Sequence, residues 1–226
     1  MAKFCTNCGK KLVNGKCDCE KKETKEEVIT NGSDLINEYI DVIKGIFIKP
    51  VDTMKKYTKK ANLTLSVIMV VLNSIIFGLF AYLFVKENVG AIMPYAYLGG
   101  YEVPASVFFI FFLLMLVFFF CLAGLLYLFT NKIMKTDSNF KELMTLISVN
   151  SVFTTITTLL ALIFIFINIW VASFIILVSS LIYLINIYHG FSQYTKIDKN
   201  KICYIFTTCY VITMFVVCYI LPKIFS

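Results

Sequence analysis

Four cysteines near the N-terminus have the residue type and the spacing of a metal site. The candidate ligands are Cys5, Cys8, Cys17 and Cys19. Two thiolates separated by two residues can reach the same zinc ion, and Gly9 permits the tight turn that follows Cys8. Asn14-Gly15 supplies a hairpin turn between the two cysteine pairs. We therefore expect residues 1–20 to form a zinc ribbon, because a segment this small needs the metal in order to fold.

A disulfide pair or free thiols are the alternatives for these four cysteines. The distribution of lysines along the chain places this segment in the cytoplasm. Disulfides rarely persist there. The spacing of Cys17-x-Cys19 is tighter than the common two-residue spacing of zinc ligands. The other cysteines lie in apolar runs without ligand spacing, and we expect them to act as small apolar residues. They are Cys121, Cys203, Cys209 and Cys218.

The cysteine segment has a recognisable pattern. Residues 4–10 read Phe-Cys-Thr-Asn-Cys-Gly-Lys, and residues 15–19 read Gly-Lys-Cys-Asp-Cys. In these residues the segment resembles the zinc ribbon at the extreme N-terminus of many bacterial membrane proteins. The resemblance implies a structural or interaction module rather than a catalytic site.

The composition of the chain indicates a protein built for a lipid bilayer. Of its 226 residues, 59% are hydrophobic and only 15% are charged, against roughly 45–50% and about 25% in soluble globular domains. A soluble domain of this length still exposes roughly a quarter to a third of its unfolded surface, so it cannot hide this much apolar area. The composition therefore excludes a soluble enzyme, a disordered chain and a collagen-like fibre.

Apolar runs predict five transmembrane helices. A run of about 20 apolar residues crosses the hydrocarbon layer as a helix. The charge-free stretch 143–189 would make a helix roughly 70 Å long, so it must fold back, and we place the turn at Asn168, beside Trp170. The predicted spans are 63–85, 103–129, 143–167, 169–189 and 202–221. The predicted fold is an all-α membrane protein with five transmembrane helices (residues 63–222) and a small N-terminal cytoplasmic zinc ribbon.

Lysines alternate between the two ends of the predicted spans. All 21 basic residues are lysine, which removes arginine-based recognition of phosphate. Thirteen lysines precede the first span and three lie in each of the loops 130–142 and 190–201, whereas the loop 86–102 has one and the turn 168–170 has none. The positive-inside rule then places the N-terminus in the cytoplasm and the C-terminus outside.

The region between the ribbon and the first span predicts a charged linker, residues 21–33, and membrane-surface helices, residues 34–62. Apolar residues with helical spacing form one face of the first helix. They are Leu35, Ile36, Tyr39, Ile40, Ile43 and Phe47. Such a helix lies in the lipid interface or packs on the bundle. We expect Gly45 and Pro50 to interrupt it, with Pro50 opening a second helix.

The second of these helices carries a basic face. Lys55, Lys56, Lys59 and Lys60 are spaced i, i+1, i+4 and i+5, which places all four on one side of a helix. Near a membrane each lysine contributes about 1 kcal/mol of attraction to anionic lipid. Without arginine or a platform of stacking aromatic residues, the face does not predict a nucleic-acid partner.

The predicted spans contain no residue that carries a formal charge at neutral pH, which disfavours an active transporter. They also lack the motifs of intramembrane hydrolysis, so we expect no enzyme. We interpret Asn73-Ser74, Gly78, Asn150-Ser151 and the threonines 154–158 as contacts between helices, with a polar lining for a substrate as the alternative. The single histidine, His189, is expected at the cytoplasmic membrane interface.

Several features of the membrane portion then point to a family. Pro50-Val51-Asp52-Thr53-Met54 precedes the first span, Lys141-Glu142-Leu143 leads into the third, a tight hairpin joins spans three and four, and a short basic loop with Gly190 precedes span five. In this pattern residues 45–222 resemble the Yip (Ypt-interacting protein) family of five-span membrane proteins. Eukaryotic members are associated with small GTPases and membrane traffic, a function that we do not transfer to this chain.

These features predict a non-enzymatic bacterial inner-membrane adaptor or scaffold. Its partners are the lipid bilayer and a cytoplasmic protein recruited through the zinc ribbon, with homo-oligomer formation left open. The alternative is a transporter or permease component in which the ribbon is regulatory. A polar pathway through spans three and four favours transport, and a solid bundle favours the adaptor.

Overall fold

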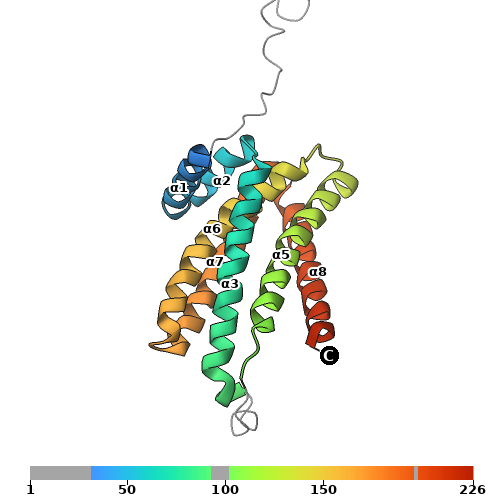
Figure 1. The fold of residues 1–226 in the computed structure, drawn as a ribbon. Helices are drawn as coiled ribbons and strands as arrows, with labels where there is room; N and C mark the ends of the chain where they lie inside the picture. The colour runs from blue at the N-terminus through green and yellow to red at the C-terminus, as the bar shows by residue number, and fades with distance from the viewer. Residues whose placement is uncertain (1–31, 93–101, 196–197, 226) are drawn as a thin grey trace, which may run out of the picture. The chain divides into compact units, whose positions relative to one another are not determined.

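The computed structural model describes residues 32–92, 102–195 and 198–225, and their regular structure is helical (Figure 1). The chain divides into two compact units, residues 1–36 and 37–226. Of the first unit, only residues 32–36 are described, as the start of α1. The helices are α1 (Gly32–Ile48), α2 (Pro50–Lys59), α3 (Leu63–Ile92), α5 (Ser106–Leu128), the π-helix η2 (Phe129–Ile133), α6 (Phe140–Ile165), α7 (Ile169–Thr195) and α8 (Lys199–Phe225).

Five helices of the described chain are long and apolar enough to cross a membrane. Their stretches are Leu63–Asn88, Ser106–Ile133, Phe140–Ile165, Ile169–Thr195 and Lys199–Tyr219. Their number agrees with the five spans expected from the sequence. Large apolar side chains such as Phe109, Leu177 and Phe215 are 56–70% exposed on the protein surface. A bilayer therefore has to cover these outer faces.

Helix α6 is the centre of the bundle. It packs against α3, α5 and α7 and also contacts α2. Within α6, 56% of the most apolar stretch is buried inside the protein, against 17% for α7. Helix α8 packs mainly on α5, at the side of the bundle (Figure 1). The helix with the most polar side chains among the spans is thus the one that other helices surround.

A tight turn joins α6 to α7. Helix α6 ends at Ile165 and α7 begins at Ile169, so the turn coincides with the position expected at Asn168. The Asn168 Oδ1 accepts hydrogen bonds from the backbone N–H groups of Trp170 at 3.0 Å and Val171 at 3.3 Å. The asparagine therefore caps the first turn of α7, and the turn contains no glycine or proline. Trp170 is 81% exposed, as expected of an interfacial tryptophan.

Helix α2 begins at Pro50 as expected, whereas α1 differs in two respects from the expectation. Helix α1 continues through Gly45 to Ile48, so only Pro50 breaks it. The glycine instead permits a close approach, because a Cβ at Gly45 would lie 2.5 Å from the Thr53 Oγ1. The buried side of α1 carries Val42 and Ile46, whereas Ile40 and Phe47 of the expected apolar face are 41% and 48% exposed. The face that packs is thus rotated from the predicted one.

Glycine also sets the approach of α3 to α5. A Cβ placed on Gly78 would lie 2.9 Å from the backbone carbonyl oxygen of Phe108. A carbonyl in a helix cannot move aside as the end of a flexible side chain can. Gly78 therefore acts as a helix-packing position, in agreement with the interpretation of this residue from the sequence.

Candidate functional site

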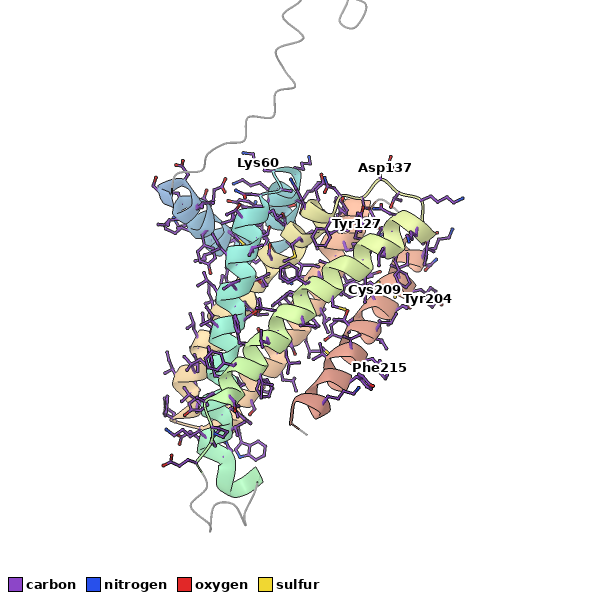
Figure 2. All side chains as sticks on the ribbon, turned by 45° about the vertical axis from the view of Figure 1, so that its right-hand side comes forward. Lys60, Tyr127, Asp137, Tyr204, Cys209 and Phe215 are labelled. Carbon is purple, nitrogen blue, oxygen red and sulfur yellow. The ribbon has the colours of Figure 1, made fainter. Side chains whose placement is uncertain are left out.

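A dense group of charges lies on the exposed surface of α2. Its four lysines, Lys55, Lys56, Lys59 and Lys60, are all exposed. The opposite side of the helix is buried and consists of Thr53, Met54, Tyr57 and Thr58. This confirms the basic face predicted from the spacing, and it shows that α2 packs on the bundle through its other side. Lys60 lies at the same end of the bundle as Asp137 of the α5–α6 connection (Figure 2).

Specific contacts hold α2 on the bundle. The buried Met54 lies against α7, since a Cβ at Gly190 would be 2.9 Å from its Cε. The Tyr57 hydroxyl donates to the backbone carbonyl of Glu38 on α1 at 3.4 Å. Burial raises the pKa of Tyr57, and the carboxylates of Asp41 and Glu38 raise it further. The phenol of Tyr57 therefore stays neutral. Because the contacts of Met54 and Tyr57 fix the position of α2, its lysines are presented by a helix that is held in place.

A recess of about 350 Å³ lies where α2 meets the start of α6 and the end of α7. Its polar lining consists of Lys55, Thr58, Lys59, Glu142, Gln193 and Tyr194. The Tyr194 hydroxyl donates to the Glu142 Oε2 at 2.6 Å and accepts a hydrogen bond from the backbone N–H of Asn139 at 3.1 Å. Glu142 also lies in the first turn of α6, where the helix dipole favours a carboxylate. The Tyr194 hydroxyl and the helix dipole thus hold the Glu142 carboxylate in place. The ammonium groups of Lys55 and Lys59 border the same polar recess.

The connection between α5 and α6 is ordered beside this recess. The Asn131 side chain donates to the Ser138 carbonyl at 2.9 Å and accepts from the Ser138 N–H at 2.8 Å. The Thr136 hydroxyl donates to the carbonyl of Thr130 at 3.0 Å. Lys135 adopts a positive φ of 52°, the left-handed conformation that a non-glycine residue rarely takes.

We define the lysine-rich end of the bundle as α2, the connection 134–139, the last turn of α7 and the first turn of α8.

The polar residues of α6 pair with neighbouring helices. The Asn73 Nδ2 on α3 donates to the Ser151 carbonyl at 3.0 Å and to the hydroxyls of Thr154 at 2.7 Å and Thr155 at 3.0 Å. The Asn150 Nδ2 donates to the carbonyl of Tyr183 on α7 at 2.8 Å. These bonds confirm that the asparagines join helices inside the bundle.

Two hydroxyl pairs extend this polar layer. Ser66 on α3 and Thr145 on α6 share a hydrogen bond of 2.9 Å, and Thr157 on α6 pairs with Ser179 on α7. In hydrocarbon a polar group without a partner is costly, so pairs of this kind fix which helices meet. The polar side chains expected in span three therefore serve mainly to join helices.

The predicted zinc ligands Cys5, Cys8, Cys17 and Cys19 lie outside the described residues. Within the described ranges the cysteines at 121, 203, 209 and 218 are free thiols, and no three or more His, Cys, Asp or Glu side chains gather there in a way that could hold a metal ion. His189 is exposed on α7, and its Nδ1 lies 2.8 Å from the Ile185 carbonyl of its own helix.

Sequence reasoning missed three tyrosines that the structure makes important. Tyr57 fastens α2 to α1, Tyr194 holds Glu142, and Tyr183 is buried among α5, α6 and α7. Only Tyr183 offered a signal, as a tyrosine within an apolar run whose hydroxyl needs a partner when the ring is buried, whereas Tyr57 and Tyr194 stand in polar segments. The 13 tyrosines of the chain made this signal weak.

The arrangement at the lysine-rich end is suited to binding rather than catalysis. It presents ammonium groups for an anionic surface, and the Glu142 carboxylate that lines the recess is held by a neutral phenol. Comparison of the chain with known families matches the Yip1 domain over residues 44–221. Neither the curated proteins nor the solved structures gave a match. The match covers most of the chain, all five membrane-spanning helices included, and the chain therefore belongs to the Yip1 domain family.

Proposed function

We propose that the protein is a non-enzymatic adaptor of a bacterial inner membrane, which recruits a cytoplasmic protein to the lysine-rich end of its bundle. The observation that carries this proposal is the division of α2 into two faces. One face is buried on α6 and α7, and the other presents four exposed lysines. A short helix that is fastened in this way is a rigid platform for an acidic protein surface.

The orientation follows from the distribution of lysine. Residues Lys55–Lys60, Lys132–Lys141 and Lys199–Lys201 include nine lysines and flank the same end of the five spans. The positive-inside rule makes this the cytoplasmic end, so the N-terminus is cytoplasmic and the C-terminus is extracytoplasmic. The platform thus faces the compartment in which a soluble partner is available.

The N-terminal segment adds a second recognition element. In this proposal Cys5, Cys8, Cys17 and Cys19 bind one zinc ion, which supplies the folding free energy of a ribbon too small to have its own core. Residues 21–31 then tether the ribbon to α1. Two weak contacts on one chain, the ribbon and the lysines of α2, raise the overall affinity through the effective concentration of the second site.

Transport is the competing function, and the polar layer argues against it. Asn73 and Asn150 donate hydrogen bonds to neighbouring helices, and the Thr154 hydroxyl accepts the one from Asn73. The predicted spans contain no residue with a formal charge at neutral pH, whereas ion and proton pathways usually require such groups. The described bundle therefore supports a scaffold better than a polar pathway.

A pull-down with the full-length chain tests the proposal. Wild-type protein and the double variant Cys5→Ser/Cys8→Ser are extracted from the same cells at matched abundance, with Cys203→Ser as the control for thiol loss outside the ribbon. We expect one soluble protein to be enriched with wild type and with Cys203→Ser, and to be lost with the double variant. Enrichment of no soluble protein by wild type would contradict the adaptor, and equal enrichment by all three proteins would contradict the role of the ribbon.

A further inference from the structure

A cavity of about 300 Å³ lies inside the membrane bundle, among α3, α5, α6, α7 and α8. Most of its wall is aromatic or aliphatic, as at Phe77, Phe118, Phe119 and Ile176. Its volume falls at the lower limit of the range typical of small-molecule sites. It is separate from the recess at the lysine-rich end, because the two share no lining residue.

Two polar side chains in the wall of this cavity each have a buried atom without a partner. Asn73 is 1% exposed and Tyr183 is 6% exposed, and both line the cavity. The Asn73 Oδ1 and the Tyr183 hydroxyl have no hydrogen-bond partner among the described residues. Unpartnered buried groups are uncommon and call for an explanation, especially in a membrane, where water does not compensate for them.

Hydrogen bonds fix the orientation of the Asn73 amide. The hydroxyls of Thr154 and Thr155 donate to the Ser151 carbonyl at 2.8 Å and 2.9 Å, so their oxygen atoms remain free to accept. The Asn73 nitrogen is the group that donates to both hydroxyls, and the amide oxygen therefore points away from them. Exchanging the two ends of the amide would place oxygen against oxygen. The Asn73 Oδ1 thus remains an acceptor without a donor, in a side chain that lines the cavity.

The depth of these atoms in the membrane limits the ligand. Asn73 lies ten residues from the start of α3 at Leu63, and Tyr183 lies 12 residues from the end of α7 at Thr195. At 1.5 Å per residue these positions are about 15 Å and about 18 Å from the lysine-rich end, near the middle of a hydrocarbon layer about 30 Å thick. No residue lining the cavity carries a formal charge. A charged lipid headgroup is therefore excluded, because nothing there compensates for its desolvation.

We propose that this cavity binds a neutral lipid that carries a free hydroxyl group. The hydroxyl donates its proton to the Asn73 Oδ1, and the same oxygen or a neighbouring ester carbonyl accepts a hydrogen bond from the Tyr183 hydroxyl. A plain hydrocarbon chain, an ether or an ester has no O–H donor and would leave Asn73 unpaired. The alkyl chain packs against the aromatic wall, as at Phe118 and Phe119.

The cavity has a lateral opening for such a lipid. Ser180 on α7 and Met214 on α8 line it and are also exposed, so it reaches the surface along these two helices. Helix α8 packs chiefly on α5 and only slightly on α7. A lipid can therefore enter from the bilayer without crossing the polar layer. This site is independent of the proposed adaptor function, which depends on the lysine-rich end and the N-terminal segment.

The test uses full-length protein in phosphatidylcholine nanodiscs and a 16-carbon alcohol that carries a photoreactive diazirine. Hexadecanol, hexadecyl methyl ether and hexadecane compete with this probe during irradiation. We expect hexadecanol to compete at least about tenfold better than the ether or the alkane, because a site with unpaired polar groups discriminates against ligands that leave them unpaired. The labelled peptides are expected to come from the cavity-lining segments of α5 or α8.

Three variants make the result decisive. Tyr183→Phe removes only the hydroxyl, and we expect about threefold to tenfold weaker labelling, the effect of losing one hydrogen bond. Tyr204→Phe changes a tyrosine that is 77% exposed on α8 and serves as the matched control, with unchanged labelling. Met115→Trp fills the cavity and should abolish labelling in protein that still elutes as a folded species. Equal competition by all three compounds, or wild-type labelling of Tyr183→Phe, would overturn the proposal in favour of water or unspecific alkyl chains.

Discussion

The side-chain amide of Asn73 on α3 lies 2.7 Å from the hydroxyl oxygen of Thr154 on α6, across 81 positions of sequence. Further bonds from the same nitrogen reach the carbonyl of Ser151 and the hydroxyl of Thr155. One side chain thus joins the first membrane span to the most buried one. The polar layer of the bundle is organised around this contact.

Replacing Asn73 with leucine should lower the free energy of unfolding by about 1 kcal/mol, since hydrogen bonds between membrane helices contribute about this amount. Asn88→Leu is the matched control on the same helix, because among the described residues the Asn88 Nδ2 bonds only the Phe84 carbonyl within α3. Unfolding in mixed micelles with increasing dodecyl sulfate measures both variants. Equal stability of the two would show that the contact to α6 does not stabilise the bundle.

The close approach at Gly78 leads to a second stability prediction. Gly78→Val places a branched side chain against the backbone of α5, and overpacking of this kind costs about 2 kcal/mol or more. Gly124→Val on α5 is the control, because a Cβ at Gly124 meets nothing within 4 Å. The measurement is the fraction of each protein that elutes as a monodisperse species after heating. Similar losses for both variants would contradict the close contact of α3 with α5.

The orientation of the chain is tested with reporter fusions. A reporter inserted at residues 136–138 should report the cytoplasm, and one fused after Ser226 should report the extracytoplasmic side. This follows from five spans between a lysine-rich start and a lysine-poor end. Alkaline phosphatase and a fluorescent protein give complementary readouts at both positions. Both fusions on the same side would contradict an odd number of spans.

Zinc binding is tested by metal analysis of purified protein. We expect about one zinc ion per chain, because the proposed ribbon supplies one set of four thiolates. Cys17→Ser should lose most of the zinc and still insert into the membrane, and Cys203→Ser on α8 should retain it. Full zinc content in Cys17→Ser would place the metal elsewhere.

Local signals made much of the fold predictable. Hydropathy predicted five spans, the capping asparagine at position 168 marked the turn, and the spacing of the lysines predicted the exposed face of α2. Asn73 and Asn150 could be assigned to helix contacts because an asparagine in hydrocarbon must find a partner. Each of these inferences needs only the residue and the solvent around it.

Tertiary packing decided what the sequence could not predict. The apolar residues of α1 fit more than one face, and only its neighbours select Val42 and Ile46 for burial. The hydrogen bond of Tyr194 to Glu142 joins residues 52 positions apart, so no local sequence pattern predicts this bond. The cavity at Tyr183 depends on the angles at which five helices meet.

Cross-linking in living cells tests whether the exposed lysines of α2 face a protein partner. A photoreactive amino acid is placed at Lys56 on this face or at Leu177, which is 56% exposed on α7 in the membrane region. We expect a discrete adduct with one soluble protein from position 56, and lipid adducts or none from position 177. No protein adduct at position 56, or the same adduct from both positions, would contradict the adaptor.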